Sequence, residues 1–204
     1  MARAGKRKIP KQARSRSLVD AVVEGAVQLL GKTGREDVSI NRIAQRVGIG
    51  SIYRYFASRD GVLNAVVDRM KEENFQRFER LLDEHRESSL EQAVEALLEE
   101  LTAVYLAQPA LTRASITTVL SFGRLIEIIR ERDRLVELLA IRIADECHVS
   151  LDEARTSARA SADMAMGVVI SEIYWGADEA QLVRAWATVR RGIHSELRHL
   201  HARE

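Results

Sequence analysis

Tyrosine and arginine side chains crowd one short segment of the chain, SIYRYFASR over residues 51–59. A guanidinium group can donate two parallel hydrogen bonds to guanine, and hydroxyl groups can bond phosphate oxygens. Ile52 and Phe56 are four residues apart, so on a helix they share one face and would point into the core. The remaining polar side chains are then free to meet a DNA groove or its phosphates: Ser51, Tyr53, Arg54 and Tyr55.

The residues before this segment have the pattern of a helix. Ser39 can cap its amino end, and apolar residues recur after it at the i, i+3, i+4 and i+7 spacing of one buried stripe. This stripe consists of Ile40, Ile43, Ala44 and Val47. Gly48 then breaks the helix. A helix, a glycine turn and a second short helix are the outline of a helix-turn-helix that reads DNA.

The run RIAQRVGIGSIYRYFASRDGVL resembles the DNA-binding signature of the TetR family of bacterial one-component regulators. The resemblance covers roughly residues 14–67, because it includes the helical run RSRSLVDAVVEGAVQLLGKTG in front of the motif. For the rest of the chain, the resemblance implies an all-helical region that binds a ligand and forms a dimer.

The motif is shorter here than is usual in that family. Family members usually carry two more residues between the turn glycine and the Gly-Ser pair, commonly a Ser and one variable residue. In this chain Gly48-Ile49 runs directly into Gly50-Ser51. The missing Ser ordinarily caps the recognition helix, so Gly50 or Ser51 must serve instead. We therefore expect a second helix that is short or re-aimed.

Predicted DNA contacts come from three places in and beside the motif. Helix amino ends favour anions, because unpaired backbone N–H groups point outward there. The assigned residues are Ser39, Asn41 and Arg42 at the start of the first helix, Tyr53 and Tyr55 on phosphates, Arg54 or Ser51 on base edges, and Arg59 on phosphate in the first turn of the next helix. Double-stranded DNA is therefore one predicted partner.

Basic charge is concentrated in the N-terminal part of the chain. The whole chain carries +1, but residues 1–60 hold thirteen Lys and Arg against five Asp and Glu, a net +8. The first sixteen residues contain seven basic side chains and no acid, a composition that builds no core. We expect a flexible arm over residues 1–14, which either follows DNA phosphates or is a solvated tail. It lacks the long apolar run of a signal peptide.

Composition favours a helical protein. The chain is 46% apolar, with two Pro, eleven Gly and no sustained alternation of polar and apolar residues. No segment approaches eighteen uncharged apolar residues, so we expect no membrane span. The lone Cys147 is expected to be a small buried hydrophobe in a reduced, cytoplasmic setting. We predict an all-α fold, with an N-terminal three-helix helix-turn-helix domain over residues 15–60 and a helical ligand-binding and dimerisation domain over residues 61–204.

Capping residues predict where the helices begin. Ser17 is expected to cap the first helix, and Ser58 to cap a linking helix that runs to about His85. Further helices are predicted at about 89–106, 109–121, 123–147, 150–175 and 178–200. Ser150 and Asp178 are the expected caps of the last two.

The last two predicted helices carry stripes that suit an intermolecular four-helix bundle. One stripe consists of small residues, which let another helix approach to about 8–10 Å, and the other is apolar at spacings of three and four. In the TetR family these final helices form the homodimer interface. We predict a homodimer; the alternative is that both stripes are buried within one chain. The interface residues are Ala158, Ala162, Ala165, Val169, Leu182, Trp186, Val189, Ile193 and Leu197.

The family resemblance also implies a pocket for an unknown small-molecule effector, between the linking helix and the final helices. Aromatic, sulfur-bearing and hydroxyl side chains can line such a pocket, although the same residues at helical spacing also build ordinary core. The candidate lining residues are Phe75, Phe78, Tyr105, Thr117, Phe122, Met164 and Trp175.

No catalytic constellation stands out in the sequence. The five histidines are scattered, and we find no Cys pair for zinc, no phosphate loop and no nucleophile elbow. We therefore expect no enzyme, no metal and no cofactor. The sequence favours a ligand-responsive homodimeric regulator, most often a repressor in this family, that binds an inverted-repeat operator and is released by an effector. The alternative is a dimeric small-molecule-binding or protein-interaction module whose shortened motif has lost sequence-specific DNA binding.

Overall fold

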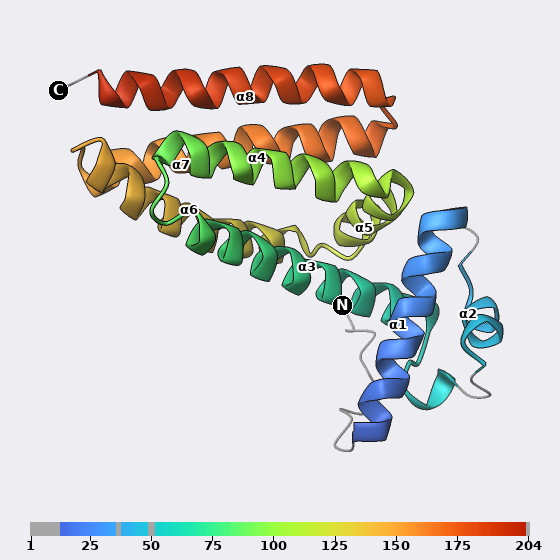
Figure 1. Ribbon diagram of the computed structural model, residues 1–204. Helices are drawn as coiled ribbons and strands as arrows, with labels where there is room; N and C mark the ends of the chain where they lie inside the picture. Colours follow the sequence, from blue (N-terminus) through green and yellow to red (C-terminus); the bar gives the residue numbers. More distant parts are fainter. Residues whose placement is uncertain (1–12, 36–37, 49–51, 203–204) are drawn as a thin grey trace. The chain divides into compact units, whose positions relative to one another are not determined.

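The protein is all-α over the residues that the computed structural model describes, which are 13–35, 38–48 and 52–202. None of these residues lies in a β-strand, and the predicted fold class is confirmed. Figure 1 shows the helices, which are α1 (Ala13–Thr33), α2 (Ile40–Val47), α3 (Arg59–Glu84), α4 (Leu90–Ala107), α5 (Pro109–Ser121), α6 (Leu125–Glu146), α7 (Leu151–Val168) and α8 (Glu179–His201). Two short elements join them: the 3-10 helix η1 (Ile52–Arg54) and the π-helical turn η2 (Val169–Ile173).

The start of one helix and the interior of another differ from the sequence prediction. α1 begins at Ala13, so Ser17 lies inside the helix as an exposed residue and does not cap it. A serine within a helix costs only a few tenths of a kcal/mol relative to good helix formers, so a cap-type residue does not by itself begin a helix. In the helix expected over residues 150–175, α7 ends at Val168, but the helical backbone continues through η2 and is α-helical again to Trp175, where the prediction ends.

Three predicted caps are present. The Ser58 hydroxyl accepts a hydrogen bond from the backbone N–H three residues later at 3.2 Å, and Ser150 does the same at 3.2 Å. Asp178 caps α8 by accepting from the backbone N–H of Gln181 at 2.7 Å. The Gln181 side chain accepts from the Asp178 N–H at 2.8 Å, which completes a capping box.

The chain divides into two compact units. The first comprises Met1–Met70 and Gln108–Gly123, and the second comprises Lys71–Ala107 and Arg124–Glu204. The chain therefore passes from one unit to the other three times, and α3 contributes to both. A division into domains over 15–60 and 61–204 remains a prediction of the sequence.

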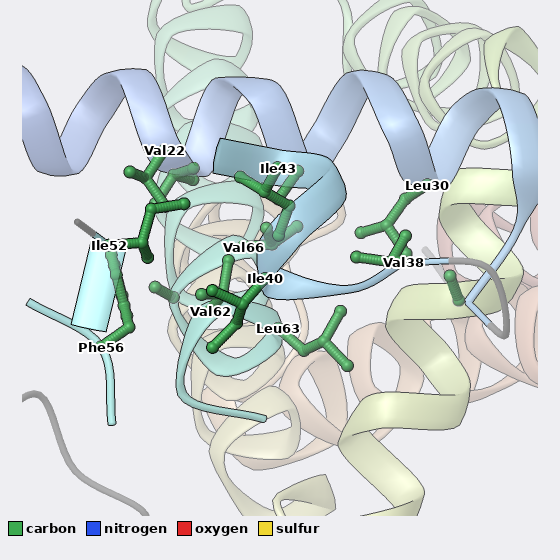
Figure 2. Close-up of a cluster of buried hydrophobic side chains, with 14 of the residues drawn as sticks. Val22, Leu30, Val38, Ile40, Ile43, Ile52, Phe56, Val62, Leu63 and Val66 are labelled. Atoms are coloured by element: carbon green, nitrogen blue, oxygen red, sulfur yellow. The ribbon is translucent and has the colours of Figure 1, made fainter. Parts of the chain in front are cut away.

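One hydrophobic core holds the first unit together (Figure 2). Val22 and Leu30 of α1, Ile43 of α2, and Ile52 and Phe56 of the η1 segment are each at most 1% exposed. Burying a side chain of this size stabilises a fold by about 1.5–3 kcal/mol. The first turns of α3 and the helix α5 complete the core with Val62, Leu63, Val66, Leu111 and Ala114.

A close approach of α1 and α2 fixes the first half of the motif. A Cβ atom placed on Gly25 of α1 would lie 2.5 Å from Cγ1 of Val47, a separation that real side chains do not adopt. Glycine therefore allows the two helices to touch here. Gly48 ends α2 in the left-handed conformation, with φ 65°, and donates its N–H to the carbonyl of Ala44.

The second unit is built by helices that pack along one another. α7 packs against α6 and α8, and α4 lies beside α8 (Figure 1). Arg155 of α7 donates from Nε and Nη2 to the two carboxylate oxygens of Glu137 on α6, at 2.7 and 3.0 Å. Nε2 of His194 on α8 lies 2.8 Å from Oε2 of Glu95 on α4. These pairs fix the register of helices whose inner faces are apolar.

Cys147, at the carboxyl end of α6, is 1% exposed and thus buried as predicted. Its Sγ lies 3.6 Å from Nδ1 of His201. A separate finding concerns membranes: none of the described helices combines the length and apolar content needed to cross a bilayer.

Candidate nucleic-acid interface

The amino end of α2 presents a group of polar side chains. Ser39 has an extended backbone, with φ −131° and ψ 156°, and its Oγ accepts a hydrogen bond from the N–H of Arg42 at 3.2 Å. Asn41 and Arg42 are exposed in the first turn. The cap fixes where α2 begins, and the helix dipole adds partial positive charge at this end. The Ser39 hydroxyl can still donate a hydrogen bond, so all three residues can face a phosphate.

η1 stands where the second helix of the motif is expected. It is a 3-10 helix of three residues, in which the N–H groups of Tyr55 and Phe56 both donate to the Ile52 carbonyl, at 2.9 and 3.0 Å. This agrees with the expectation of a shortened second helix. The predicted cap Gly50 and the predicted base contact Ser51 lie outside the described residues.

Two buried anchors decide which side chains η1 turns outward. Ile52 and Phe56 are 1% and 0% exposed, and Figure 2 shows both directed into the core of the first unit. Tyr53 is 55% exposed and Arg54 is also exposed, whereas Tyr55 is half-buried against the core. η1 therefore presents one phenol and one guanidinium to a groove, and both groups can donate hydrogen bonds to base edges or phosphates.

Arg59 faces the protein in this structure. Its Nη2 donates to the backbone carbonyl of Arg35 in the loop between α1 and α2. The Nε atoms of Arg59 and Arg35 are both buried without a hydrogen-bond partner. The guanidinium predicted to contact phosphate thus joins the start of α3 to the loop before α2.

Arg46 is a residue that the sequence reasoning passed over. Its Nε and Nη2 donate to Oε1 of Gln28 on α1, at 2.9 and 2.6 Å, and Gln28 donates in turn to Glu24 at 3.0 Å. A forked pair of hydrogen bonds holds α2 at a defined angle on α1. The signal in the sequence was a basic residue on the exposed face of a short helix, which alone does not distinguish a brace from a DNA contact.

The residues predicted for the dimer interface are mostly buried within the single chain, and their place in a dimer remains a prediction. Ala158 is 2% exposed, Leu197 is 2% and Trp186 is 5%, and of the nine residues only Ala162 is more than a tenth exposed. A side chain that is already enclosed by its own chain has little surface left for a partner. The others enclosed in this way are Ala165, Val169, Leu182, Val189 and Ile193. The alternative weighed from the sequence, burial of both stripes within one chain, describes these residues.

The same two helices expose a different apolar face. Met164 of α7 is 39% exposed and Val183 of α8 is 53% exposed. Tyr174 and Trp175 follow η2; they are 37% and 81% exposed and meet edge to face with ring centroids 5.4 Å apart. Monomeric proteins rarely leave a tryptophan and several aliphatic side chains exposed together, so this face is suited to a protein partner.

The residues predicted for an effector pocket are divided between the two units. Phe75 and Phe78 are buried in the second unit, and burial of its hydroxyl raises the pKa of Tyr105. Thr117 and Phe122 belong to the first unit. Met164 and Trp175 lie on the exposed face, so they line no enclosed cavity of a single chain.

One open depression occurs on the second unit away from all of these residues. Its walls come from α4, α8 and the turn after α3, and they are lined by His85, Glu91, Gln92, Glu95, Ala96, Glu99 and His194. In the part of the chain that the structure describes, no group of three or more His, Cys, Asp or Glu side chains is arranged to hold a metal ion.

Comparisons with known proteins agree with this geometry. Residues 22–66 match the family described as bacterial regulatory proteins, tetR family. No curated protein matches the sequence. A solved TetR transcriptional regulator from Rhodococcus sp. RHA1 is 24% identical, with a TM-score of 0.56 over 90% of this chain and 97% of that chain.

Two further solved structures have the same fold. A TetR-family transcriptional regulator from Streptomyces coelicolor is 19% identical, with a TM-score of 0.56 over 89% of this chain and 98% of that one. The fatty acid degradation regulator FadR from Bacillus halodurans is 18% identical, with a TM-score of 0.56 over 92% and 96%. At these identities the likeness concerns the fold.

Over the described residues, the fold is the one found in solved TetR-family transcriptional regulators. The family match over residues 22–66 and the shared fold confirm the predicted resemblance to the TetR family.

We expect Arg59→Ala to lower the free energy of unfolding by about 1.5–3 kcal/mol, because it removes a charged donor from the Arg35 carbonyl. Arg54→Ala, a matched change on the exposed side of η1, should stay within about 0.5 kcal/mol of the wild type. Urea denaturation measures both values. Equal stabilities for the two variants would contradict a stabilising hydrogen bond from Arg59 to the Arg35 carbonyl and would favour an exposed Arg59 side chain.

Proposed function

We propose that this chain is a ligand-responsive transcriptional regulator, a repressor, that binds an inverted-repeat operator in double-stranded DNA as a homodimer. The observation that carries the proposal is the anchored η1, which holds Tyr53 and Arg54 outward beside the capped amino end of α2. This is the arrangement in which one element enters the major groove while the helix before it meets the backbone.

In this proposal each exposed polar residue of the motif has one task. Arg54 reads a base edge, for which guanine is the preferred partner of a guanidinium. Tyr53, Tyr55 and the amino end of α2 bind phosphates and fix the register of the protein on DNA. Ser51 is retained as a candidate base contact. Arg59 supports the loop before α2 and reaches phosphate only if it leaves the Arg35 carbonyl.

The homodimer is proposed on a revised surface of α7 and α8. An operator with twofold symmetry needs two motifs about 34 Å apart, one for each major groove on the same side of the duplex. The exposed face with Met164, Trp175 and Val183 offers apolar area that a second copy can cover. The helices are those predicted from the sequence, but the proposed contacts are exposed residues and not the buried stripes.

A small-molecule effector completes the proposal. α3 carries residues of both units, so a change in its position is a direct route from the second unit to the motif. A ligand shifts such an equilibrium only when it binds one state more tightly than the other. The protein would act without catalysis and within the cytoplasm.

A second candidate function follows from the same short element. η1 has three residues, which leaves little surface for reading bases. A dimeric small-molecule-binding or protein-interaction module that no longer reads a DNA sequence would have this feature too. The two candidates differ in whether any DNA sequence is preferred.

Enrichment of random duplex DNA by the purified protein, at physiological salt, separates the two candidates. We expect the enriched pool to contain an inverted repeat whose half-sites are one helical turn apart, because the two motifs are related by the dimer axis. A folded, dimeric protein that enriches no sequence would contradict the regulator and favour the binding module. Binding without preference but with a steep salt dependence would also contradict sequence-specific regulation.

We expect Trp175→Lys and Val183→Lys to give folded monomers at concentrations where the wild type is a dimer. Both side chains are exposed in the single chain, so the cost falls on the interface and not on the core. Ile141→Lys is the matched control, because Ile141 is 60% exposed on α6, away from this face. Sedimentation measures the mass, and circular dichroism checks the helical content. Dimers that persist in both variants would contradict the proposed surface.

A further inference from the structure

The three passages of the chain between the two units lie at defined residues. The first falls between Met70 and Lys71 inside α3, and the second falls between Ala107 and Gln108. The third falls between Gly123 and Arg124, just before α6. The covalent connections between the units run through these three short segments.

The carboxylate of Glu127 contacts the first second-unit residue after two of these three crossings. Oε2 of Glu127, in the first turn of α6, accepts from Nε and Nη2 of Arg124 at 3.1 and 2.5 Å. The same oxygen lies 3.5 Å from Nζ of Lys71. Lys71 and Arg124 are the first residues after the first and third passages. Glu127 thus joins two segments of the chain that are more than fifty residues apart in sequence.

The local environment favours the charged form of Glu127. The Arg124 and Lys71 side chains are only 15% and 21% exposed, so the pairs are screened by solvent less than ordinary surface pairs. The hydrogen bonds from Arg124 lower the pKa of Glu127 from its ordinary value of 4.5; desolvation opposes them, and the charges of Arg124 and Lys71 lower the pKa further. The carboxylate is therefore ionised at neutral pH.

Further contacts along α6 continue this connection to α3. Nζ of Lys71 lies 3.9 Å from Oε1 of Glu131, and Arg134 donates to Oε2 of Glu131 at 3.0 Å. The guanidinium of Arg134 lies over the ring of Phe75, with 3.8 Å between Cζ and the ring centroid. Cation–π contact and ion pairs thus follow one face of α6 along the second half of α3.

The segments just before these passages have bonds of their own within the first unit. Oγ of Ser115 on α5 lies 3.1 Å from Sδ of Met70, and it lies 2.9 Å from the carbonyl oxygen of Leu111, the stronger acceptor for its one proton. α5 ends at Ser121, and Gly123 then turns the chain in the left-handed conformation, with φ 65°. Glycine adopts this turn without strain and can also adopt other backbone conformations, because it has no Cβ atom. The start of α6 therefore has a defined position only if contacts hold the residues after Gly123.

We propose that Glu127 is a positioning residue for DNA binding, because its carboxylate ties the first and third passages together and so fixes where α3 enters the second unit. The proposal rests on the proposed function, since a fixed α3 matters when two motifs must be set at one spacing. An effector that draws Glu127 away from Lys71 or Arg124 would loosen both passages at once.

Hydrogen exchange of the full-length protein tests the tie without DNA. We expect Glu127→Gln to speed amide exchange about tenfold in both segments 68–74 and 121–127, because the two charge-assisted connections weaken together. Glu137→Gln is the matched control, because Glu137 is another α6 carboxylate whose pKa is lowered by an arginine, here Arg155. It should leave both segments within about twofold of the wild type. Equal exchange in the two variants would overturn the tie.

The effect on DNA affinity tests the positioning role. On the enriched inverted repeat, Glu127→Gln should weaken binding by about threefold to tenfold, since fewer molecules hold α3 in the competent position, while Glu137→Gln should not. Lys71→Gln should weaken binding too, and should add little to Glu127→Gln because the two residues act through one contact. Glu127→Asp, which keeps the charge, should restore part of the affinity.

The outcomes distinguish this inference from the proposed function. If the wild type prefers no DNA sequence, the proposed function is wrong. The exchange experiment still tests whether Glu127 holds the segments of Lys71 and Arg124 together. If exchange increases as expected but operator affinity is unchanged, Glu127 is structural only and the positioning role is wrong. Unchanged melting temperatures for the folded variants show that global unfolding is not the cause of either result.

Discussion

The burial of Ile52 and Phe56 is the interaction on which the candidate DNA-binding surface depends. A three-residue 3-10 helix has too few internal hydrogen bonds to be stable alone, so its orientation must come from packing. The two anchors insert into a core built by α1, α2, α5 and the first turns of α3. Because both lie on one side of η1, Tyr53 and Arg54 between them point to solvent, while Tyr55 packs partly against the core. The direction of Tyr53 and Arg54 is thus set by hydrophobic burial.

The rest of the first unit keeps that core in shape with contacts of several kinds. Gly25 lets α1 and α2 meet, and Arg46 fixes their angle through Gln28. Arg59 holds the loop before α2 from the other side. Several of the basic residues near the motif therefore position it, which leaves a small set of side chains for the nucleic acid. Few base contacts make the precise placement of each one more important.

The fold and the core of the motif could be predicted because periodicity reports burial. Ile40, Ile43 and Val47 recur at helical spacing, and burial of such a stripe strongly constrains the local structure. The short second helix was also predictable, because two residues are missing where a helix would begin. The start of α1 was not, since Ser17 is tolerated within a helix almost as well as at its end.

For the residues predicted to form the dimer interface, the sequence predicts burial but not which chain buries them. A stripe of small or apolar residues, such as Ala158 and Leu197, predicts that a face is buried but does not say by which chain. In the structure α6, α4 and the neighbouring helix cover those faces, and only the three-dimensional arrangement reveals that Val183 is exposed. The ion pair between Glu127 and Lys71 could not be predicted for a similar reason, because the two residues are distant along the chain. Long-range contacts of this kind leave no local pattern.

The most direct test of the account is the base-by-base discrimination of wild type and Arg54→Ala on single substitutions of the enriched operator. If burial of Ile52 and Phe56 aims Arg54 into the groove, wild type should lose about 1–3 kcal/mol at one symmetric pair of guanines, and Arg54→Ala should be indifferent there. Equal weakening of Arg54→Ala on every sequence, or discrimination unchanged from wild type, would contradict the account, because η1 would then not read bases.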